Sequence, residues 1–136
     1  IMHLRSLHAR AIVCLLSGNL LDSVSASEKF HFTVKSSKFQ YFEAWSFYLL
    51  GNSAFQTFNK DKSQLALQEA IGYKGMINYR VYFDALAGSV LLSSLKGDDK
   101  ATESFLMAMK QTAKKMKDTS FKTFYQSVSG IFYSSN

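Results

Sequence analysis

The chain has 136 residues, of which 47% are hydrophobic and 15% aromatic, and its formal net charge is +6. This length and apolar content are sufficient for one folded domain, and the positive charge permits an acidic partner without requiring one. No apolar run approaches the ~18 residues of a membrane-spanning helix, and the single cysteine, Cys14, excludes an internal disulfide. We therefore expect a cytoplasmic protein without a membrane span.

The sequence predicts seven helices joined by short connections. Proline, the strongest helix breaker, is absent, and apolar residues recur at three- and four-residue steps. In chain order, we expect helices at about 3–17, 20–36, 39–58, 62–74, 77–96, 99–117 and 119–134. Gly72 and Gly75 fit the end of the fourth helix and its link to the fifth. Because short connections make consecutive helices antiparallel, the fold class is all-α, built from tandem helix hairpins.

The first predicted helix has an alternative interpretation as a secretion signal. Basic Arg5 and Arg10 precede the apolar run AIVCLL and the small-residue run SVSA, within residues 1–26. The apolar run is short, and Gly18 and Asn19 interrupt the pattern soon after it. We therefore favour a helix of the folded domain.

Three segments line up without gaps as an internal repeat. They are HARAIVCLLSGN, LGNSAFQTFNKD and AGSVLLSSLKGD, at residues 8–19, 50–61 and 87–98. Each ends in a turn whose last residue is Asn or Asp, both good N-caps for a following helix. The second residue of each segment is small: Ala9, Gly51 and Gly88. We interpret Gly51 as a position of close packing between helices, with Gly130 in a fourth, incomplete copy.

The repeats divide a single domain, residues 1–136, into three helix hairpins and a partial fourth. Their approximate bounds are 3–36, 39–74, 77–117 and 119–134. Stacked hairpins of this kind form an α-solenoid. Because the fourth copy lacks its turn, we expect the chain to be a piece of a longer protein.

Two stretches resemble a tetratricopeptide repeat. GNLLDSVSASEKF (18–30) resembles the turn and second helix of such a repeat, and LLGNSAF (49–55) resembles the Leu-Gly-Asn segment of its first helix. The resemblance covers nearly the whole chain and implies a right-handed tetratricopeptide-like α-solenoid. The long repeats look like those of peptide-sensing regulators of Gram-positive bacteria and their phages, the quorum-sensing and arbitrium receptors.

The resemblance to peptide-sensing regulators implies a function for Asn52. In those families a concave groove holds a short peptide, and asparagines on the helices bind the peptide backbone. Asn52 matches that kind of position. A helix-turn-helix that binds DNA usually precedes the repeats, and this chain shows none. DNA would therefore be contacted only indirectly, through regions outside this chain.

A candidate peptide-binding column follows the small position of each repeat: Arg10, Asn52 and Ser89. The resemblance implies that this column faces the inner groove. Arginine can hold a carboxylate with two hydrogen bonds, and asparagine can both donate to and accept from a peptide backbone. The alternative is that the column is a solvated helix face.

Three aromatic residues lie one or two helical turns before this column: Trp45, Tyr48 and Tyr82. Aromatic side chains bury a large area while keeping a polar edge, so we expect them to form walls of the groove. The alternative is that they are ordinary core residues between hairpins.

A basic stripe on the predicted sixth helix is a weaker candidate for phosphate binding. Lys110, Lys114 and Lys117 fall on one face, with Lys115 beside them. No aromatic side chain interleaves on that face, and the dipole at a helix C-terminus favours the same residues without a partner.

The sequence contains no complete catalytic or metal-binding motif. His3 and His8 are five residues apart, and the Glu-x-x-His spacing of Glu28 and His31 has no second pair to complete a site. We therefore expect neither enzymatic activity nor a cofactor nor a metal.

The leading hypothesis is a peptide- or protein-binding repeat domain. It would be the sensing part of a transcriptional or signalling regulator, with a short peptide or protein segment as partner and a homodimer as a further option. The alternatives are a structural assembly module without a small ligand and, ranked lower, a nucleic-acid-binding domain.

Overall fold

The computed structural model describes residues 2–117 and 119–135, and within them the chain is all-helical. The seven helices are α1 (Met2–Leu16), α2 (Leu20–Lys35), α3 (Gln40–Gln56), α4 (Lys60–Ile71), α5 (Tyr79–Leu95), α6 (Asp99–Met116) and α7 (Thr119–Ser135). An isolated bridge between Lys74 and Ile77 is the one β-type pairing of the described residues. The predicted all-α class is confirmed, and the predicted helix ends differ from the observed ones by at most three residues.

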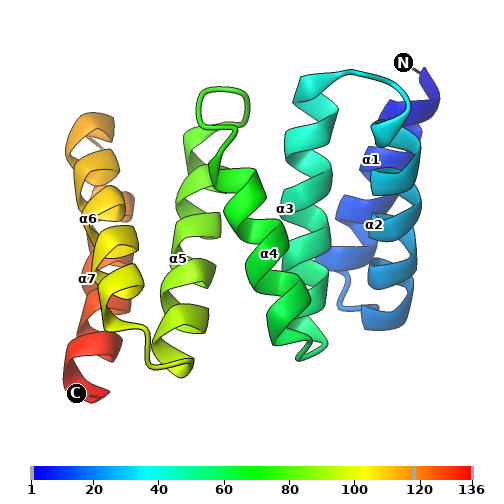
Figure 1. Cartoon of the computed structure of the whole chain (residues 1–136). Coiled ribbons are helices and arrows are strands. Elements are labelled where there is room, and N and C mark those ends of the chain that lie inside the picture. Colours follow the sequence, from blue (N-terminus) through cyan, green and yellow to red (C-terminus); the bar gives the residue numbers. More distant parts are fainter. Residues whose placement is uncertain (1, 118, 136) are drawn as a thin grey trace.

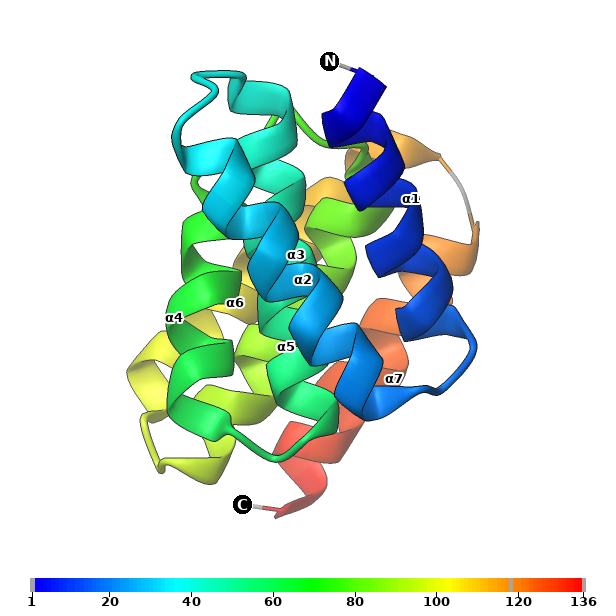
Figure 2. The same ribbon diagram turned by 90° about the vertical axis from the view of Figure 1, so that its right-hand side faces the viewer.

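The helices form a row in chain order, from α1 and α2 at one end through α3, α4 and α5 to α6 and α7 at the other (Figure 1). Each helix packs against the next one, and the odd-numbered helices also contact one another along the row, α1 with α3, α3 with α5, and α5 with α7. A view turned by 90° has α1 and α2 in front of the later helices (Figure 2). None of the described helices has the length and apolarity to cross a membrane.

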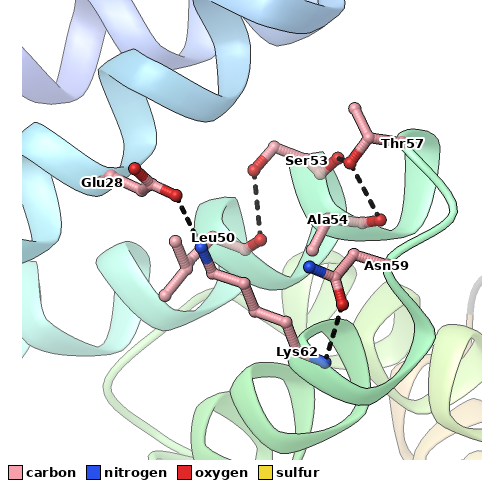
Figure 3. A network of polar contacts seen from close by, with 7 residues as sticks. All are labelled: Glu28, Leu50, Ser53, Ala54, Thr57, Asn59 and Lys62. Carbon is pink, nitrogen blue, oxygen red and sulfur yellow. Dashed lines mark hydrogen bonds and ion pairs between the residues drawn. The ribbon is translucent and has the colours of Figure 1, made fainter.

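The turn between the two helices of a hairpin recurs three times with the same geometry. A residue with positive φ, Gly18, Phe58 or Gly97, precedes an N-cap residue. The N-caps accept a hydrogen bond from the backbone three residues later: Asn19, Asn59 and Asp98. These caps are 40 and 39 residues apart. Figure 3 shows the middle turn, where Asn59 accepts from the backbone nitrogen of Lys62.

The helix that follows each of these turns buries the same positions. Four residues after the cap lies a buried hydroxyl, and eight and eleven residues after it lie further buried side chains. The three sets are Ser23, Ser27 and Phe30 on α2; Ser63, Leu67 and Ala70 on α4; and Thr102, Leu106 and Met109 on α6. Steps of four, four and three residues keep one face of a helix turned to the core. The second helices of the three hairpins thus share a pattern of burial, and the turns before them share a geometry.

The turns correct the alignment of the middle repeat. The gapless alignment paired Asn19 with Asp61, whereas the structure gives the equivalent cap to Asn59. A shift of two residues rotates a position by about 200° around a helix. The predicted column of small residues therefore does not occupy one face of successive helices, and Ala9 is exposed while an added Cβ at Gly130 would meet open space.

Gly51 is nevertheless a position of close packing. A Cβ at Gly51 would lie 2.7 Å from Cγ of Leu67 and 3.0 Å from its backbone nitrogen. A Cβ at Gly88 would lie 2.7 Å from Cδ1 of the same leucine. One side chain of α4 thus fills the space left by a glycine on α3 and another on α5. The prediction for Gly51 is confirmed.

The core is divided between the two ends of the row. An N-terminal cluster contains Phe30, Val34, Phe42 and Leu49, and a C-terminal cluster contains Phe83, Leu86, Met109 and Phe132, among others. Trp45 packs against both clusters. A smaller cluster consists of Leu67 on α4 with Ala85 and Leu92 on α5.

On the surface, α2 and α4 are linked by an ion pair. Lys62 Nζ lies 2.5 Å from Glu28 Oε1, with both side chains partly exposed (Figure 3). Exposed pairs of this kind contribute about 0–1 kcal/mol to stability. Packing of the apolar faces therefore determines how the hairpins are placed.

Candidate functional site

A cavity with a volume of about 910 Å³ lies beside the N-terminal half of α5. We call it the α5 groove. Its lining comes from three odd-numbered helices, from the loop between α4 and α5, and from the end of α6: Tyr48, Gly75, Ile77, Asn78, Tyr79, Arg80, Val81, Phe83, Asp84, Met116, Ser120, Phe121 and Phe124. The loop and the ends of α6 and α7 nearest this groove lie at the upper end of Figure 1. The groove thus joins two successive hairpins.

A polar cluster links α3 and α5 at this groove. The Tyr48 hydroxyl donates a hydrogen bond of 2.6 Å to Oδ2 of Asp84. It also accepts one of 3.1 Å from Nδ2 of Asn52, which lies one turn later on α3. The tyrosine hydroxyl is thus held between a donor and an acceptor, and its orientation is determined.

The Tyr48 hydroxyl keeps its proton. Burial, and then the neighbouring charge of Asp84, raise the pKa of Tyr48 well above its usual value of 10.0. The side chain therefore remains a hydrogen-bond donor to Asp84 at physiological pH.

Asp84 is a half-buried carboxylate on a mainly apolar helix. It is the one acidic residue of α5, and its neighbours Phe83 and Ala85 are buried. Arg80 lies one turn earlier on the same helix and also lines the groove, yet no ion pair joins the two among residues 2–117 and 119–135. The hydrogen-bond donor to Asp84 is instead the Tyr48 hydroxyl.

Aromatic side chains form the apolar wall of the groove. The rings of Phe83 and Phe121 meet edge to face with centroids 5.0 Å apart, and Phe124 lies 5.6 Å from Phe83. Phe83 and Phe121 are buried, whereas 42% of Phe124 remains exposed. Phe124 is therefore the aromatic ring that a ligand in the groove can reach most readily.

Two of the six residues predicted to bind peptide come together at this groove. They are Tyr48, which lines it, and Asn52, which holds the hydroxyl of Tyr48. Both are partly exposed. Asn52 reaches the groove only through the hydroxyl of Tyr48, and the alignment that led to its selection does not hold.

The predictions for Ser89 and Tyr82 are wrong. Ser89 has no exposed surface, and its hydroxyl donates to the carbonyl of Ala85 on its own helix. The two-residue shift of the middle repeat places Ser89 about 200° away from the face that Asn52 occupies. Tyr82 is 5% exposed and belongs to the C-terminal core cluster, and burial raises the pKa of its hydroxyl. The alternative, that it is a core aromatic, holds for Tyr82.

Arg10 lies outside the α5 groove. It is exposed on α1 and lines a separate cavity of about 190 Å³ between α1 and α2, together with Asp22 and Lys29. The predicted column of Arg10, Asn52 and Ser89 is therefore not assembled. Its three members occupy three different environments.

Trp45 lies in a small aromatic cluster between α1 and α3. Its ring is 4.6 Å from that of His8 and 5.9 Å from that of Tyr48. Trp45 Nε1 and His8 Nε2 are buried and have no hydrogen-bond partner among the described residues. Trp45 therefore packs against the ring of Tyr48 but does not itself line the α5 groove.

The lysines of α6 are solvent-exposed. Lys110, Lys114 and Lys117 are all exposed, as is Lys115. Lys114 and Lys115 lie in the last turn of the helix, where positive charge interacts favourably with the helix dipole. Their exposure agrees with either of the two interpretations of this stripe.

Sequence reasoning missed Asp84 and Phe124. A signal for Asp84 was present, since a lone acidic residue within an apolar helix must find a polar environment at the surface or a partner. Phe124 carried no such signal, because its exposure depends on how α7 packs against α5. No group of three His, Cys, Asp or Glu side chains able to hold a metal ion occurs in the described part of the chain.

The α5 groove is thus a cavity with an apolar wall, one charged group of each sign and an ordered tyrosine hydroxyl. Such an arrangement can bind a ligand through side chains of different chemistry. In comparisons with known proteins, no family, no curated protein and no solved structure matches this chain.

Proposed function

We propose that this chain is a peptide- or protein-binding helical repeat domain whose binding site is the α5 groove. The observation that carries the proposal is the joining of an apolar aromatic wall to the Asn52–Tyr48–Asp84 cluster in one cavity of about 910 Å³. Pockets that bind ligands specifically combine apolar walls with a few well-placed polar groups.

We further propose that the repeats form a right-handed tetratricopeptide-like α-solenoid. The recurring turns 40 and 39 residues apart support this, as do the contacts between odd-numbered helices along the row. Solenoids of this kind present a continuous inner surface to an extended ligand.

The biological role would be that of the sensing part of a transcriptional or signalling regulator. Because the groove joins two hairpins, a bound segment would favour one angle between them over others, and so alter a distant surface or dimerisation. The resemblance to peptide-sensing regulators supports this role.

Selection of peptides tests the proposed binding function. Dodecapeptides from a randomised phage-displayed library would be selected on the folded protein and measured individually by fluorescence polarisation. Phe124→Ala and Asn52→Ala should each weaken the selected peptides, and Phe124→Ala by about tenfold or more, because exposed aromatic anchors dominate binding. Tyr133→Ala, at an exposed aromatic of the same helix outside the groove, is the control.

Two results would contradict the binding proposal. One is that no peptide is enriched above background. The other is that the selected peptides bind all four proteins with equal affinity, since they would then occupy another surface.

A structural assembly module is a second candidate. Large apolar side chains are exposed near both ends of the row: Leu16, Leu21 and Phe32 on α1 and α2, and Ile131 and Tyr133 on α7. Exposed apolar groups can join copies or a larger partner. Light scattering over a concentration series would reveal such assembly as a rise in mass.

A further inference from the structure

We infer that the segment bound in the α5 groove carries a basic side chain, lysine or arginine, that pairs with Asp84. This inference rests on the proposed peptide-binding function and names the chemistry of its ligand. The juxtaposition that carries it is a half-buried carboxylate, held by one neutral hydroxyl, inside a groove with aromatic walls.

Asp84 retains unused capacity to accept hydrogen bonds. An ionised carboxylate has about four acceptor positions. Within residues 2–117 and 119–135, one hydrogen bond reaches Asp84, from the Tyr48 hydroxyl, and no ion pair does. Because Tyr48 is neutral, the negative charge is oriented but not compensated.

A ligand that covers the groove must compensate this charge. It would remove water from a carboxylate that is already partly buried, and an unpaired buried charge is costly. A lysine ammonium or arginine guanidinium supplies both the opposite charge and several N–H donors. A neutral or acidic side chain in the same place would leave the carboxylate unpaired.

The groove walls also suit a basic side chain. Lysine and arginine carry long apolar stems that pack along apolar surface while the charged end reaches a polar partner. Phe83, Phe124 and Val81 line the same cavity as Asp84. An arginine can in addition stack its guanidinium on an aromatic face.

Positive groups near the groove would favour an acidic ligand instead of a basic one. Arg80 lines the groove, and so do the first residues of α5 and α7, where helix dipoles favour anions. Arg80 is exposed, however, whereas Asp84 is half-buried. Because exposed charges are stabilised by water and contribute little to pairing, the requirement of Asp84 decides the ligand.

The experiment compares peptides selected on three proteins from the same randomised dodecapeptide phage library. These are the wild type, Asp84→Asn, and the control Glu103→Gln, which makes the same change of net charge at an exposed site on α6. The substitution in Asp84→Asn preserves shape and an acceptor for Tyr48. Lysine and arginine should be enriched in the wild-type and Glu103→Gln pools but not in the Asp84→Asn pool.

A double-mutant cycle then tests the pairing without depending on one variant. One selected synthetic peptide, and its version with the basic residue replaced by glutamine, would be measured against wild type and Asp84→Asn. Removing the charge-assisted pair should weaken binding about tenfold, whether the change is made in the protein or in the peptide. Making both changes together should weaken binding little further. Arg80→Gln should bind the basic peptide more tightly, because it removes a repelling charge.

The outcomes separate the two proposals. If peptides bind in the groove, as Phe124→Ala reports, but the wild-type pool is not basic or the Asp84→Asn pool is equally basic, the pairing with Asp84 is overturned and peptide binding stands. If no peptide is enriched, or if none is weakened by Phe124→Ala, both proposals fail.

Discussion

At the scale of single residues, three glycines in helices differ in their surroundings. Gly51 faces Leu67 so closely that a Cβ would meet both its side chain and its backbone nitrogen, whereas at Gly88 the contact is with a terminal methyl. At Gly130 an added Cβ would meet no atom within 4 Å. The same substitution should therefore have different effects at the three positions.

We expect Gly51→Ala to lower the free energy of unfolding by about 1–3 kcal/mol, because backbone atoms of α4 would have to move. Gly88→Ala should cost less, since Leu67 can rotate its methyl away. Gly130→Ala should raise the free energy of unfolding by about 0.5–1 kcal/mol, because alanine has a higher helix propensity than glycine and its Cβ would meet no clash. Urea denaturation of the three variants measures the order, and a destabilised Gly130→Ala would contradict it.

His8 should make stability depend on pH. Its ring stacks on Phe30 at 5.3 Å and lies 4.6 Å from that of Trp45, and burial lowers its pKa from 6.5. The unfolded chain therefore binds a proton more readily than the folded one. The stability that neutral His8 contributes is present above pH 6.5 and is lost as the pH falls through the lower, folded-state pKa.

Thermal unfolding at pH 7.5 and pH 5.5 measures this effect. We expect Tm to fall on acidification in the wild type and to fall less in His8→Phe, which keeps an aromatic ring in the site. Some pH dependence of Tm should remain because of His31, whose pKa is lowered mainly by burial and also by the charge of Lys35. His3→Gln, at an exposed position, is the control. An unchanged pH dependence in His8→Phe would refute the assignment.

At the scale of secondary-structure elements, the hairpin turns explain where the helices end. Gly18 and Gly97 adopt positive φ without steric cost, but the equivalent residue of the middle turn is Phe58, with φ of 62°. A non-glycine residue in this conformation is strained. The Phe58 side chain is 86% exposed, so packing does not offset the strain.

Phe58→Gly should therefore stabilise the protein by about 0.5–1 kcal/mol. This net gain is the backbone strain that glycine relieves, minus the larger conformational entropy that glycine loses on folding. Gly18→Ala and Gly97→Ala should act in the opposite direction, because they introduce the same strain. Chemical denaturation tests all three. A loss of stability in Phe58→Gly would show that its ring makes a contact worth more than the strain.

At the scale of the whole molecule, contacts reach no further than two helices along the chain. The described helices pack against their immediate neighbours and, for odd-numbered helices, against the next odd-numbered one, and a surface ion pair joins α2 to α4. The N-terminal and C-terminal clusters have no buried residue in common. Stability should therefore vary along the row, as it does in proteins whose elements contact mainly their neighbours.

Hydrogen exchange can measure this variation with a matched pair of substitutions. Phe132→Ala in the C-terminal cluster and Phe30→Ala in the N-terminal cluster each remove a buried ring, at a cost of about 3–5 kcal/mol. We expect Phe132→Ala to reduce amide protection mainly in α5, α6 and α7, and Phe30→Ala mainly in α1, α2 and α3. If each variant instead lost amide protection equally in all the described helices, the domain would unfold as a single cooperative unit.

Part of the candidate site could be predicted from the sequence, and the rest could not. Asn52 and Tyr48 are four residues apart, so one helical turn brings them together wherever the helix lies. Asp84 is 36 residues from Tyr48, and their hydrogen bond exists because α5 packs beside α3. Ser89 was misplaced because its face was inferred from an alignment two residues out of step in the middle repeat.

The all-helical class and the helix ends, to within three residues, were predictable from sequence, because helix propensity, capping by Asn or Asp and glycine conformation act within a few residues. Which side of each helix faces the groove depends instead on how the helices pack together. Leu67 on α4 occupies the space beside Gly51 on α3 and Gly88 on α5, so its packing helps to place these two helices against α4. A displacement of two residues turns a helix face by about 200°, and so decides whether a polar side chain meets a ligand or the core.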